Sequence, residues 1–280
     1  MILSYHPCYV GDENRLCAGR HPDDNDAATM RSADAIILPQ GCSAPLFEMA
    51  ASNCKHVFPD YTNRFRFPGK IGQASLFRHY KVAHPETLSF ESMAMFHRQF
   101  EPGKFHSPLG YPFVFKFSWS GEGKYVWRVD DLAAFQLLTE KAVLFESTGQ
   151  NGFLLQRYIE THGRSLRVVV INETCIAYWR IQPDPARFGS QCAQGATIDY
   201  RLHPVLQKKA IVAVLDFCKK TGINLAGFDI IFDVNDPSAT PLFLEINYYF
   251  GRRGLGGSEG FYQILCPEID RWLSGLNFKI

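Results

Sequence analysis

The stretch that decides the fold is Gly227-Phe-Asp-Ile-Ile-Phe-Asp233, followed after a polar segment by Pro241-Leu-Phe-Leu-Glu-Ile-Asn247. Phe, Ile and Leu dominate both runs, whereas Asn, Asp, Pro and Ser fill residues 235–240 between them. This composition is typical of two β-strands joined by a turn. We therefore expect a β-hairpin over residues 227–247.

Three oxygen-bearing side chains interrupt this apolar hairpin. Glu245 and Asn247 are two residues apart, so a pleated strand points them to the same face. If the strands pair antiparallel, Asp229 lies beside Glu245. Two carboxylates would repel each other there without a cation, and Mg²⁺ takes oxygen ligands, typically one or two carboxylates with water and phosphates. Asp229, Glu245 and Asn247 therefore predict a Mg²⁺ site; the alternative is that they lie at solvated strand ends.

Composition bounds the class of protein. The chain has 280 residues, of which 46% are hydrophobic and 20% charged, with a formal net charge of +1. This length suits a large core or two to three small lobes. The near-neutral charge argues against nucleic-acid and membrane-surface binding. The eight cysteines include no C-x-x-C spacing, so we expect reduced, buried thiols. We find no apolar run long enough to span a bilayer and no signal-peptide pattern, and we therefore expect a cytoplasmic protein.

The first 68 residues read as a small, truncated doubly wound α/β lobe. Short apolar runs at Ile2–Ser4, Ala35–Leu38 and His56–Phe58 suit buried parallel strands, with a helix over 45–51 and a polar loop over 19–26. No G-x-G-x-x-G follows the first strand. This absence argues against a dinucleotide site.

A second hairpin, around Lys116, carries a glycine-rich tip. Alternating residues predict strands before and after Ser120-Gly-Glu-Gly123. Glycines free backbone N–H groups to surround phosphate oxygens, and a nearby ammonium adds a point charge. A plain hairpin with an exposed lysine is the alternative.

The remaining elements follow from their apolar patterns. Helices are expected over 70–80, 90–100, 131–145, 204–220 and from about 257 to 273, strands over 153–159, 166–171 and 175–181, and a loop over 183–196.

From Lys70 onward these pieces, in this order, resemble the ATP-grasp superfamily, closest in style to its RimK-like and D-alanine–D-alanine ligase members. The motifs are Lys70 with Pro85-Glu-Thr87, Pro112-Phe-Val-Phe-Lys116 with Gly121-Glu-Gly123, Gln156-Arg-Tyr-Ile159, and the acidic hairpin. The resemblance implies an α/β (α+β) ATP-grasp fold: a pre-ATP-grasp lobe over 1–68, a lobe with the lysine and glycine loop over 69–157, and a lobe with the metal site over 158–280.

The same resemblance implies roles for individual residues. ATP would be held by two lysines, the glycine loop and the adenine hinge, and Mg²⁺ by the three hairpin oxygens. The nucleotide residues implied are Lys70, Lys116, Gly121, Glu122, Gly123, Gln156, Arg157, Tyr158 and Ile159. This chain departs from the family pattern at three positions that concern recognition. Ser165 is found where the family often has an acidic residue that binds the ribose, and Glu160 is a possible substitute. Gly227 replaces an arginine, and Asn247-Tyr-Tyr-Phe-Gly251 replaces the usual Asn-x-x-Pro-Gly.

Arginines are the candidates for the reacting groups. Arg180 precedes the expected loop, and its planar fork suits the γ-phosphate and an acyl phosphate; a surface ion pair is the alternative. Arg252 and Arg253 follow the metal strand among glycines, where a carboxylate substrate would bind, although one of the two is expected to be structural.

The function implied is an ATP-dependent carboxylate–amine, or thiol, ligase that uses Mg²⁺ and an acyl phosphate. Its partners would be a small-molecule or peptide carboxylate and an amine-type nucleophile. Two alternatives stay open: a kinase that phosphorylates a hydroxyl, and an ATP-binding scaffold without turnover. A P-loop is absent, and Gly256-Gly-Ser-Glu-Gly260 lacks the later histidine of a serine hydrolase. Whether the chain forms a homodimer is left open.

Overall fold

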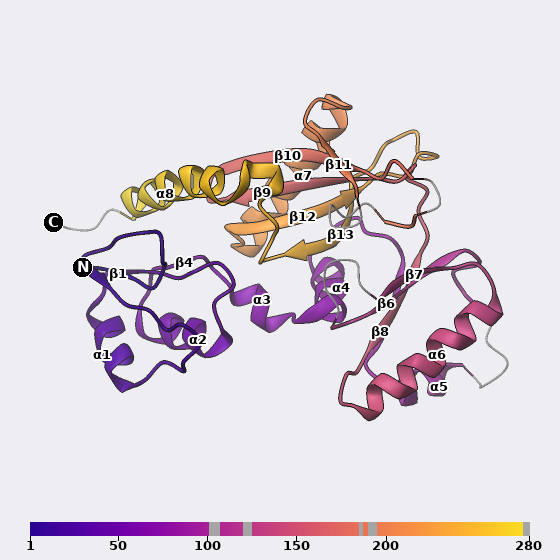
Figure 1. Cartoon of the computed structure of the whole chain (residues 1–280), viewed down its shortest axis with the longest axis horizontal. Helices are drawn as coiled ribbons and strands as arrows, with labels where there is room; N and C mark the ends of the chain where they lie inside the picture. The colour runs from indigo at the N-terminus through magenta and orange to yellow at the C-terminus, as the bar shows by residue number, and fades with distance from the viewer. Residues whose placement is uncertain (101–106, 120–124, 185–186, 190–194, 277–280) are drawn as a thin grey trace.

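Three β-sheets lie one after another along the long axis of the molecule (Figure 1). The computed structural model describes residues 1–100, 107–119, 125–184, 187–189 and 195–276. Each sheet takes all of its strands from one of the ranges 1–68, 69–157 and 158–280. The α/β architecture expected from the sequence is confirmed; the domain boundaries themselves stay a prediction.

The N-terminal sheet is parallel, in the order β2-β1-β3-β4. Its strands are β1 (Ile2–Ser4), β2 (Glu13–Asn14), β3 (Ala35–Ile37) and β4 (Val57–Phe58), with helices α1 (Asp24–Ser32), α2 (Ala44–Asn53) and α3 (Thr62–Arg66). Helix α1 was not predicted, because its polar first turn reads as a loop. A reciprocal capping box between Asp23 and Asp26 starts it, and this pattern is a recognised N-terminal signal.

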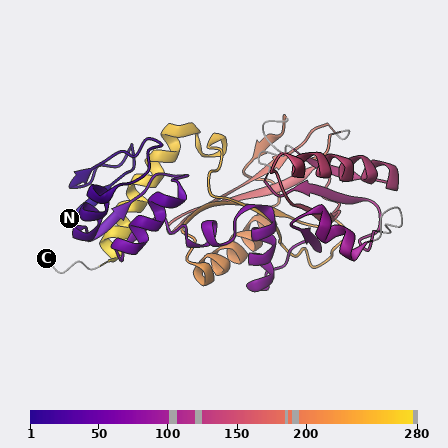
Figure 2. The same ribbon diagram turned by 90° about the horizontal axis from the view of Figure 1, so that it is seen from below.

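Both faces of this small sheet are covered, by helices from opposite ends of the chain. Ile36 and Leu38 share a core with residues of α2, whereas Ala35 and Ile37 pack with apolar residues of α8 (Gly257–Gly275). The alternation follows from the two-residue period of a strand. Figures 1 and 2 both show α8 beside the N-terminal lobe. The C-terminal helix thus supplies one of the two layers of a doubly wound lobe.

The middle sheet is antiparallel, in the order β5-β8-β6-β7. Its elements are β5 (Thr87–Phe90), α5 (Met93–Gln99), β6 (Phe113–Phe117), β7 (Val126–Val129), α6 (Leu132–Ser147) and β8 (Phe153–Arg157). The prediction of one helix over 90–100 was wrong at its start. Phe90 ends a strand, and the Ser92 side chain caps α5 by accepting from Met95 N–H. The interior is aromatic; Phe115 and Phe153 stack with centroids 5.0 Å apart.

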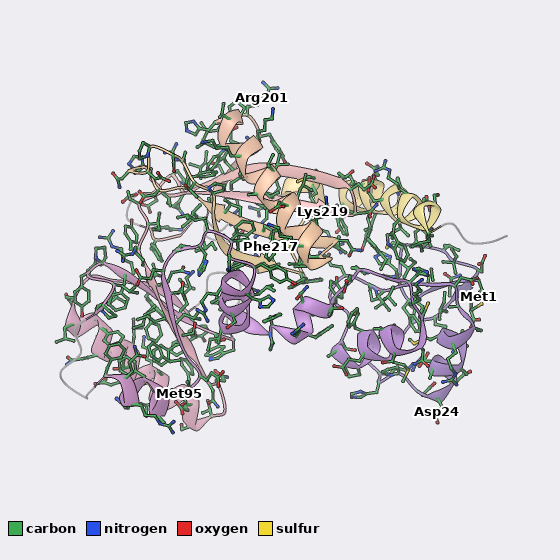
Figure 3. All side chains as sticks on the ribbon, turned by 180° about the vertical axis from the view of Figure 1, so that it is seen from behind. Met1, Asp24, Met95, Arg201, Phe217 and Lys219 are labelled. Carbon is green, nitrogen blue, oxygen red and sulfur yellow. The ribbon has the colours of Figure 1, made fainter. Side chains whose placement is uncertain are left out.

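The C-terminal sheet has the order β11-β10-β9-β12-β13, and each pair of neighbours is antiparallel. Its elements are β9 (Arg164–Ile171), β10 (Thr174–Ile181), β11 (Thr197–Asp199), α7 (Pro204–Thr221), β12 (Leu225–Ile231) and β13 (Leu242–Asn247). Helix α7 packs on one face, where Phe217 contacts Phe228 and Phe243 with centroids 6.0 and 5.3 Å apart (Figure 3).

The opposite face of this sheet changes character along its strands. Near the middle sheet, β9 presents Ser165 and Arg167; farther along the same face, Val169 and Ile171 join the core beneath α8. One face therefore serves a polar site at one end and an apolar interface at the other.

Helix α4 (Gly69–His79) ties the two larger sheets together. The Gln73 side chain donates to Ile246 O (2.7 Å) and accepts from Ile246 N–H (2.9 Å). This pair of bonds satisfies the outer edge of β13 at Ile246. The short helix η2 (Arg253–Leu255) leads from β13 to α8. Among the described residues, no helix is both long and apolar enough to cross a bilayer.

Candidate active site

A cavity of about 740 Å³ lies between the middle and C-terminal sheets. Residues of β6, β7 and β8 line one side, and residues of β9, β10, β12 and β13 line the other. Clefts of this size and position between lobes are typical small-molecule sites. The cavity therefore brings together segments from residue 70 to residue 245.

The acidic hairpin has the predicted register. Asp229 is the cross-strand partner of Glu245, and Gly227 is the partner of Asn247. Next to this pair the register shifts, since Ile230 pairs with Phe243 and Leu244 has no residue opposite it. Such a bulge re-aims the side chains beside it. Both Leu244 and Glu245 consequently line the cavity.

Asp229 is not a free carboxylate. Its Oδ1 accepts a hydrogen bond from Arg167 Nε at 2.5 Å and lies 2.8 Å from Arg180 Nη2. Its Oδ2 accepts from Arg167 Nη2 at 3.2 Å and from Asn247 Nδ2 at 3.3 Å. A carboxylate has about four lone-pair sites. All of them are taken, so Asp229 can ligate a metal only if one of these donors releases it.

Burial and charge oppose each other at Asp229, which is only 6% exposed. Burial alone raises the pKa of this carboxyl, but the guanidinium groups of Arg167 and Arg180 outweigh it and hold the pKa below its ordinary value. Asp229 is therefore ionised at neutral pH. The arrangement is a buried, doubly compensated ion cluster, which is costly to break by removing one partner.

Lys116 lies deep in the cavity, on β6. Its Nζ donates to Gln156 Oε1 at 2.6 Å, and Gln156 Nε2 in turn donates to Thr87 Oγ1 at 2.9 Å. Burial lowers the pKa of Lys116 to about 8, assisted by the charge of Lys70 and opposed by Glu245 and Asp229. A ligand anion at this ammonium would restore the pKa, because it favours the charged form.

Lys70 faces the acidic hairpin from α4. Its Nζ lies 3.9 Å from Glu245 Oε1, and both residues line the cavity. The two predicted nucleotide lysines and the predicted metal carboxylates therefore meet in one space. Lys116 comes from the middle sheet, Lys70 from α4, and both carboxylates from the C-terminal sheet, which makes the cavity an interface between lobes.

The predicted hinge runs along the rim of the cavity from the end of β8. Gln156, Arg157, Tyr158 and Ile159 all line the cavity. Arg157 N–H donates to Glu86 O at 2.8 Å, and the two side chains form an ion pair. These contacts fix the strand end at the point where the chain passes from the middle sheet to the C-terminal sheet.

Cations outnumber anions around the cavity. Among the described lining residues there are seven Lys or Arg and four Asp or Glu. The chain as a whole has a net charge of only +1. This local excess favours an anionic ligand such as a polyphosphate. The cationic residues are Lys70, Lys116, Arg128, Arg157, Arg164, Arg180 and Arg187.

Other predicted site residues lie elsewhere. Gly121, Glu122 and Gly123 fall outside the described residues. Arg252 does not line the cleft; its guanidinium donates to Ser258 Oγ (3.2 Å), Tyr262 Oη (3.0 Å) and Gln40 Oε1 (3.1 Å). Arg252 thus joins the N-terminal lobe to α8. Arg253 begins η2 and is exposed.

A family model described as the RimK-like ATP-grasp domain matches residues 82–260, more than half of the chain. The chain belongs to the RimK-like ATP-grasp family. A probable alpha-L-glutamate ligase from Aeromonas salmonicida (strain A449) is 31% identical over 112 residues. That match covers 39% of this chain and 35% of the relative, so it spans about a third of the relative's length.

Solved structures share the fold of this RimK-like protein. A RimK domain protein from Sphaerobacter thermophilus has a TM-score of 0.62 at 15% identity, covering 95% of this chain and 98% of that chain. D-alanine–D-alanine ligase from Bacillus anthracis, complexed with ATP, has a TM-score of 0.60 at 13% identity, covering 94% and 85%. VanG D-Ala:D-Ser ligase from Enterococcus faecalis has a TM-score of 0.60 at 15% identity, covering 87% and 73%. The predicted ATP-grasp fold is thereby confirmed.

Sequence reasoning missed Arg167. In the sequence, Arg167 is one polar residue in the apolar run Leu166-Arg-Val-Val-Val-Ile171. That interruption at a strand position is the same kind of signal that singled out Asp229, Glu245 and Asn247. Its partner became visible only through the register of β9 against β12, which places Arg167 opposite Asp229.

Proposed function

We propose that this protein is an ATP-dependent carboxylate–amine ligase that works through an acyl phosphate. One observation carries the proposal. Lys70 and Lys116, from the middle lobe, meet Glu245 and the Asp229 cluster, from the C-terminal lobe, across one electropositive cavity. Phosphate-binding cations and metal-binding oxygens are the two sets of groups that phosphoryl transfer requires.

The chain's own residues would bind the nucleotide as follows. Lys116 and Lys70 hold the α- and β-phosphates, and the hinge from Gln156 to Ile159 borders the adenine. Glu160 is the carboxylate nearest in sequence to this hinge; it lines the cavity and accepts from His162 N–H at 2.8 Å and Tyr158 Oη at 3.1 Å. We assign Glu160, rather than Ser165, to the ribose, because Ser165 Oγ already accepts from Arg180.

The residues of the acidic hairpin fit Mg²⁺ in chemistry. Glu245 and the amide oxygen of Asn247 would supply oxygen ligands, although only Glu245 lines the cavity, and Asp229 would join them only once a donor releases it. When bound, Mg²⁺ would offset negative charge on the β- and γ-phosphates. Within the described residues, no group of three or more His, Cys, Asp or Glu side chains could hold a metal ion. A metal site at this hairpin would therefore need the amide oxygen of Asn247.

Arg180 is assigned to the γ-phosphate and the acyl phosphate. It lines the cavity, is only 7% exposed, and its fork is held by Asp229 and Ser165. A fixed guanidinium offers donors where charge develops, without reorganisation during the reaction. The substrate carboxylate attacks the γ-phosphorus, ADP leaves, and the amine then displaces phosphate from the acyl group.

The amine is assigned by chemical class only. The Aeromonas salmonicida relative is named a probable alpha-L-glutamate ligase, so L-glutamate is the first amino acid to test. A kinase on the same fold would stop after phosphoryl transfer, and a scaffold would not turn over.

Hydroxylamine trapping tests the proposal. With ATP, Mg²⁺ and a panel of carboxylates, a ligase releases phosphate and yields a hydroxamate, whereas a kinase consumes ATP without forming one. Glu245→Gln is the informative variant, because the Glu245 side chain is 27% exposed, lies at the long distance of 3.9 Å from Lys70 Nζ, and makes none of the bonds described for the Asp229 cluster. Glu259→Gln, in the first turn of α8, is the matched control. Full hydroxamate formation by Glu245→Gln, or none by the wild type with any carboxylate, would refute the proposal.

A further inference from the structure

A second cavity, of about 580 Å³, lies in the N-terminal lobe. It is lined by the segment after β1, the loop before α1, the segment between β3 and α2, and part of α3. None of its lining residues also lines the nucleotide cleft. The cavity is therefore a separate site.

The topology places this cavity where parallel sheets bind ligands. The chain runs from β1 outward to β2 and then returns to β3 on the other side of β1. Such a reversal leaves a crevice outside the carboxyl ends of the two strands, and ligands bind in that crevice. The N-terminus of α2 opens into it through Ser43 and Ala44. Its first turn carries no acidic residue and the Ser43 side chain makes no capping bond, so the positive end of the helix stays uncompensated.

One buried amide in this lining is half satisfied. Gln40 is 9% exposed, and its Oε1 accepts from Arg252 Nη2 at 3.1 Å. That bond fixes the amide orientation, because only the oxygen can accept from a guanidinium. The other end, Nε2, is buried and has no partner among the described residues. An unsatisfied buried donor is unfavourable, so a ligand that accepts from it would be stabilised.

The remaining lining sets the charge and polarity of that ligand. Arg20 and Arg64 line the cavity, and the described lining residues include no Asp or Glu. Arg20 is paired with Asp26. Arg64 lies against the Tyr61 and Phe65 rings and uses Nη1 on Cys42 O at 2.9 Å, which leaves most of its five donors for a ligand. Apolar contacts come from Leu16, Leu46 and Phe65.

We propose that this cavity binds a small organic anion through a carboxylate, with Gln40 Nε2 and the Arg64 guanidinium as the donors. Arg252 is then a positioning residue that orients Gln40. Arg252 follows Asn247 by five residues, so the Cα atoms of these two residues are at most about 18 Å apart. The carboxylate belongs either to the substrate of the proposed ligase or to an effector of it. Binding itself does not depend on the ligase assignment, because it is measured without nucleotide.

The test is titration calorimetry of the full-length protein, without ATP, using succinate, glutarate, L-glutamate, benzoate and inorganic phosphate. We expect saturable binding of at least one carboxylate. Gln40→Glu should weaken it by about tenfold or more, because an oxygen replaces the donor while the bond to Arg252 becomes an ion pair. Arg64→Gln should weaken it similarly. Arg66→Gln removes the same charge from an exposed residue that does not line the cavity, and should bind as the wild type does.

The melting temperature of each variant separates lost binding from lost folding, and Gln40→Glu is expected to melt no lower than the wild type. If this variant unfolds, Arg64→Gln decides. Absence of saturable carboxylate binding, binding of phosphate alone, or undiminished binding in the folded variants would overturn the proposal. Where a carboxylate does bind, adding Mg²⁺, ATP and hydroxylamine distinguishes the sources: a substrate is converted to its hydroxamate, whereas an effector changes the rate of ATP hydrolysis without being consumed.

Discussion

Arg180 Nη2 lies 2.8 Å from Asp229 Oδ1, although the two residues are on strands that are not neighbours. Arg180 is on β10 and Asp229 is on β12, with β9 between them. The residue of β9 opposite Arg180 is Ser165, whose small side chain lets the arginine pass over the strand while accepting two of its N–H groups at 2.9 and 3.2 Å. The strand between them thus determines where the guanidinium is held.

Arg180→Met should abolish most turnover without unfolding the protein. Asp229 keeps its two bonds to Arg167, so no buried charge is left alone, whereas the γ-phosphate loses its proposed donor. We expect kcat to fall by about 100-fold, the usual loss for one preorganised donor. Phosphate release measures kcat, and Arg201→Met is the control, because Arg201 (labelled in Figure 3) is exposed and does not line the cavity. An unchanged kcat would remove Arg180 from the reaction.

Arg167→Met should act on stability. This arginine makes two of the four bonds to a buried carboxylate, and removing one partner of a buried ion pair costs about 3–5 kcal/mol. Urea unfolding measures the loss. The double variant Arg167→Met/Asp229→Asn should lose less than the sum of the two single variants, because each single change leaves the other group uncompensated. Strict additivity would mean that the two side chains do not stabilise each other.

Gly227→Ala should displace Arg167. A Cβ at residue 227 would lie 2.9 Å from Arg167 Nη1 and 3.0 Å from Phe250 Cβ. Overpacking of this kind costs about 1–3 kcal/mol, and the Asp229 cluster would be disturbed with it. Gly251→Ala is a matched control, since a Cβ there meets nothing within 4 Å. Equal melting temperatures for the two variants would show that the guanidinium moves aside without cost.

The lowered pKa of Lys116 predicts that the contribution of this residue to stability depends on pH. Its pKa in the folded protein is about 8, below the ordinary value of 10.5, so the folded state binds fewer protons between these two values. The contribution of Lys116 to stability therefore rises with pH across that window, by up to about 1.4 kcal/mol per unit, whereas the raised pKa values of buried thiols such as Cys42 and Cys218 act in the opposite direction. The stability of Lys116→Met relative to the wild type should therefore fall as the pH rises from 8 to 10.5, while that of Lys219→Met, an exposed position on α7, should not change. Urea unfolding from pH 7 to 10.5 gives the comparison, and parallel curves for the wild type and Lys116→Met would contradict it.

The same shift predicts weaker nucleotide binding at alkaline pH. A neutral amine binds phosphate less well than an ammonium, so the affinity for a non-hydrolysable ATP analogue should fall as the pH rises above about 8, and binding near that pH should take up protons. Calorimetry in buffers of different ionisation enthalpy measures the uptake. Binding without proton uptake would place the phosphates away from Lys116.

Local patterns were enough to predict most elements and the pairing of Asp229 with Glu245. Long apolar runs mark β9, β10 and β12, and the polar turn at 235–240 favours an antiparallel hairpin. Elements with weaker signals were missed: β11 is three residues long, and α1 begins with charged residues whose capping role depends on one box.

The state of the site was harder to predict, because it depends on residues distant in sequence. Arg167 is 62 residues from Asp229, and Gln40 is 212 residues from Arg252. Nothing in the runs that contain Arg167 and Gln40 indicates these partners. The register of Asp229 against Glu245 was therefore predicted correctly, but the saturation of Asp229 by two arginines was not foreseen, and neither was the location of Arg252 outside the cleft.

Helix α8 covers one face of the sheet formed by the first sixty-eight residues, and that sheet in turn covers part of α8. Ala35, Ile37 and Phe58 on one side meet Phe261 and Ile269 on the other, and all five are almost completely buried. A protein expressed from residue 69 onward would consequently expose an apolar stripe along its last helix. Anyone trimming this enzyme candidate for crystallisation should expect such a product to aggregate, and should shorten it elsewhere.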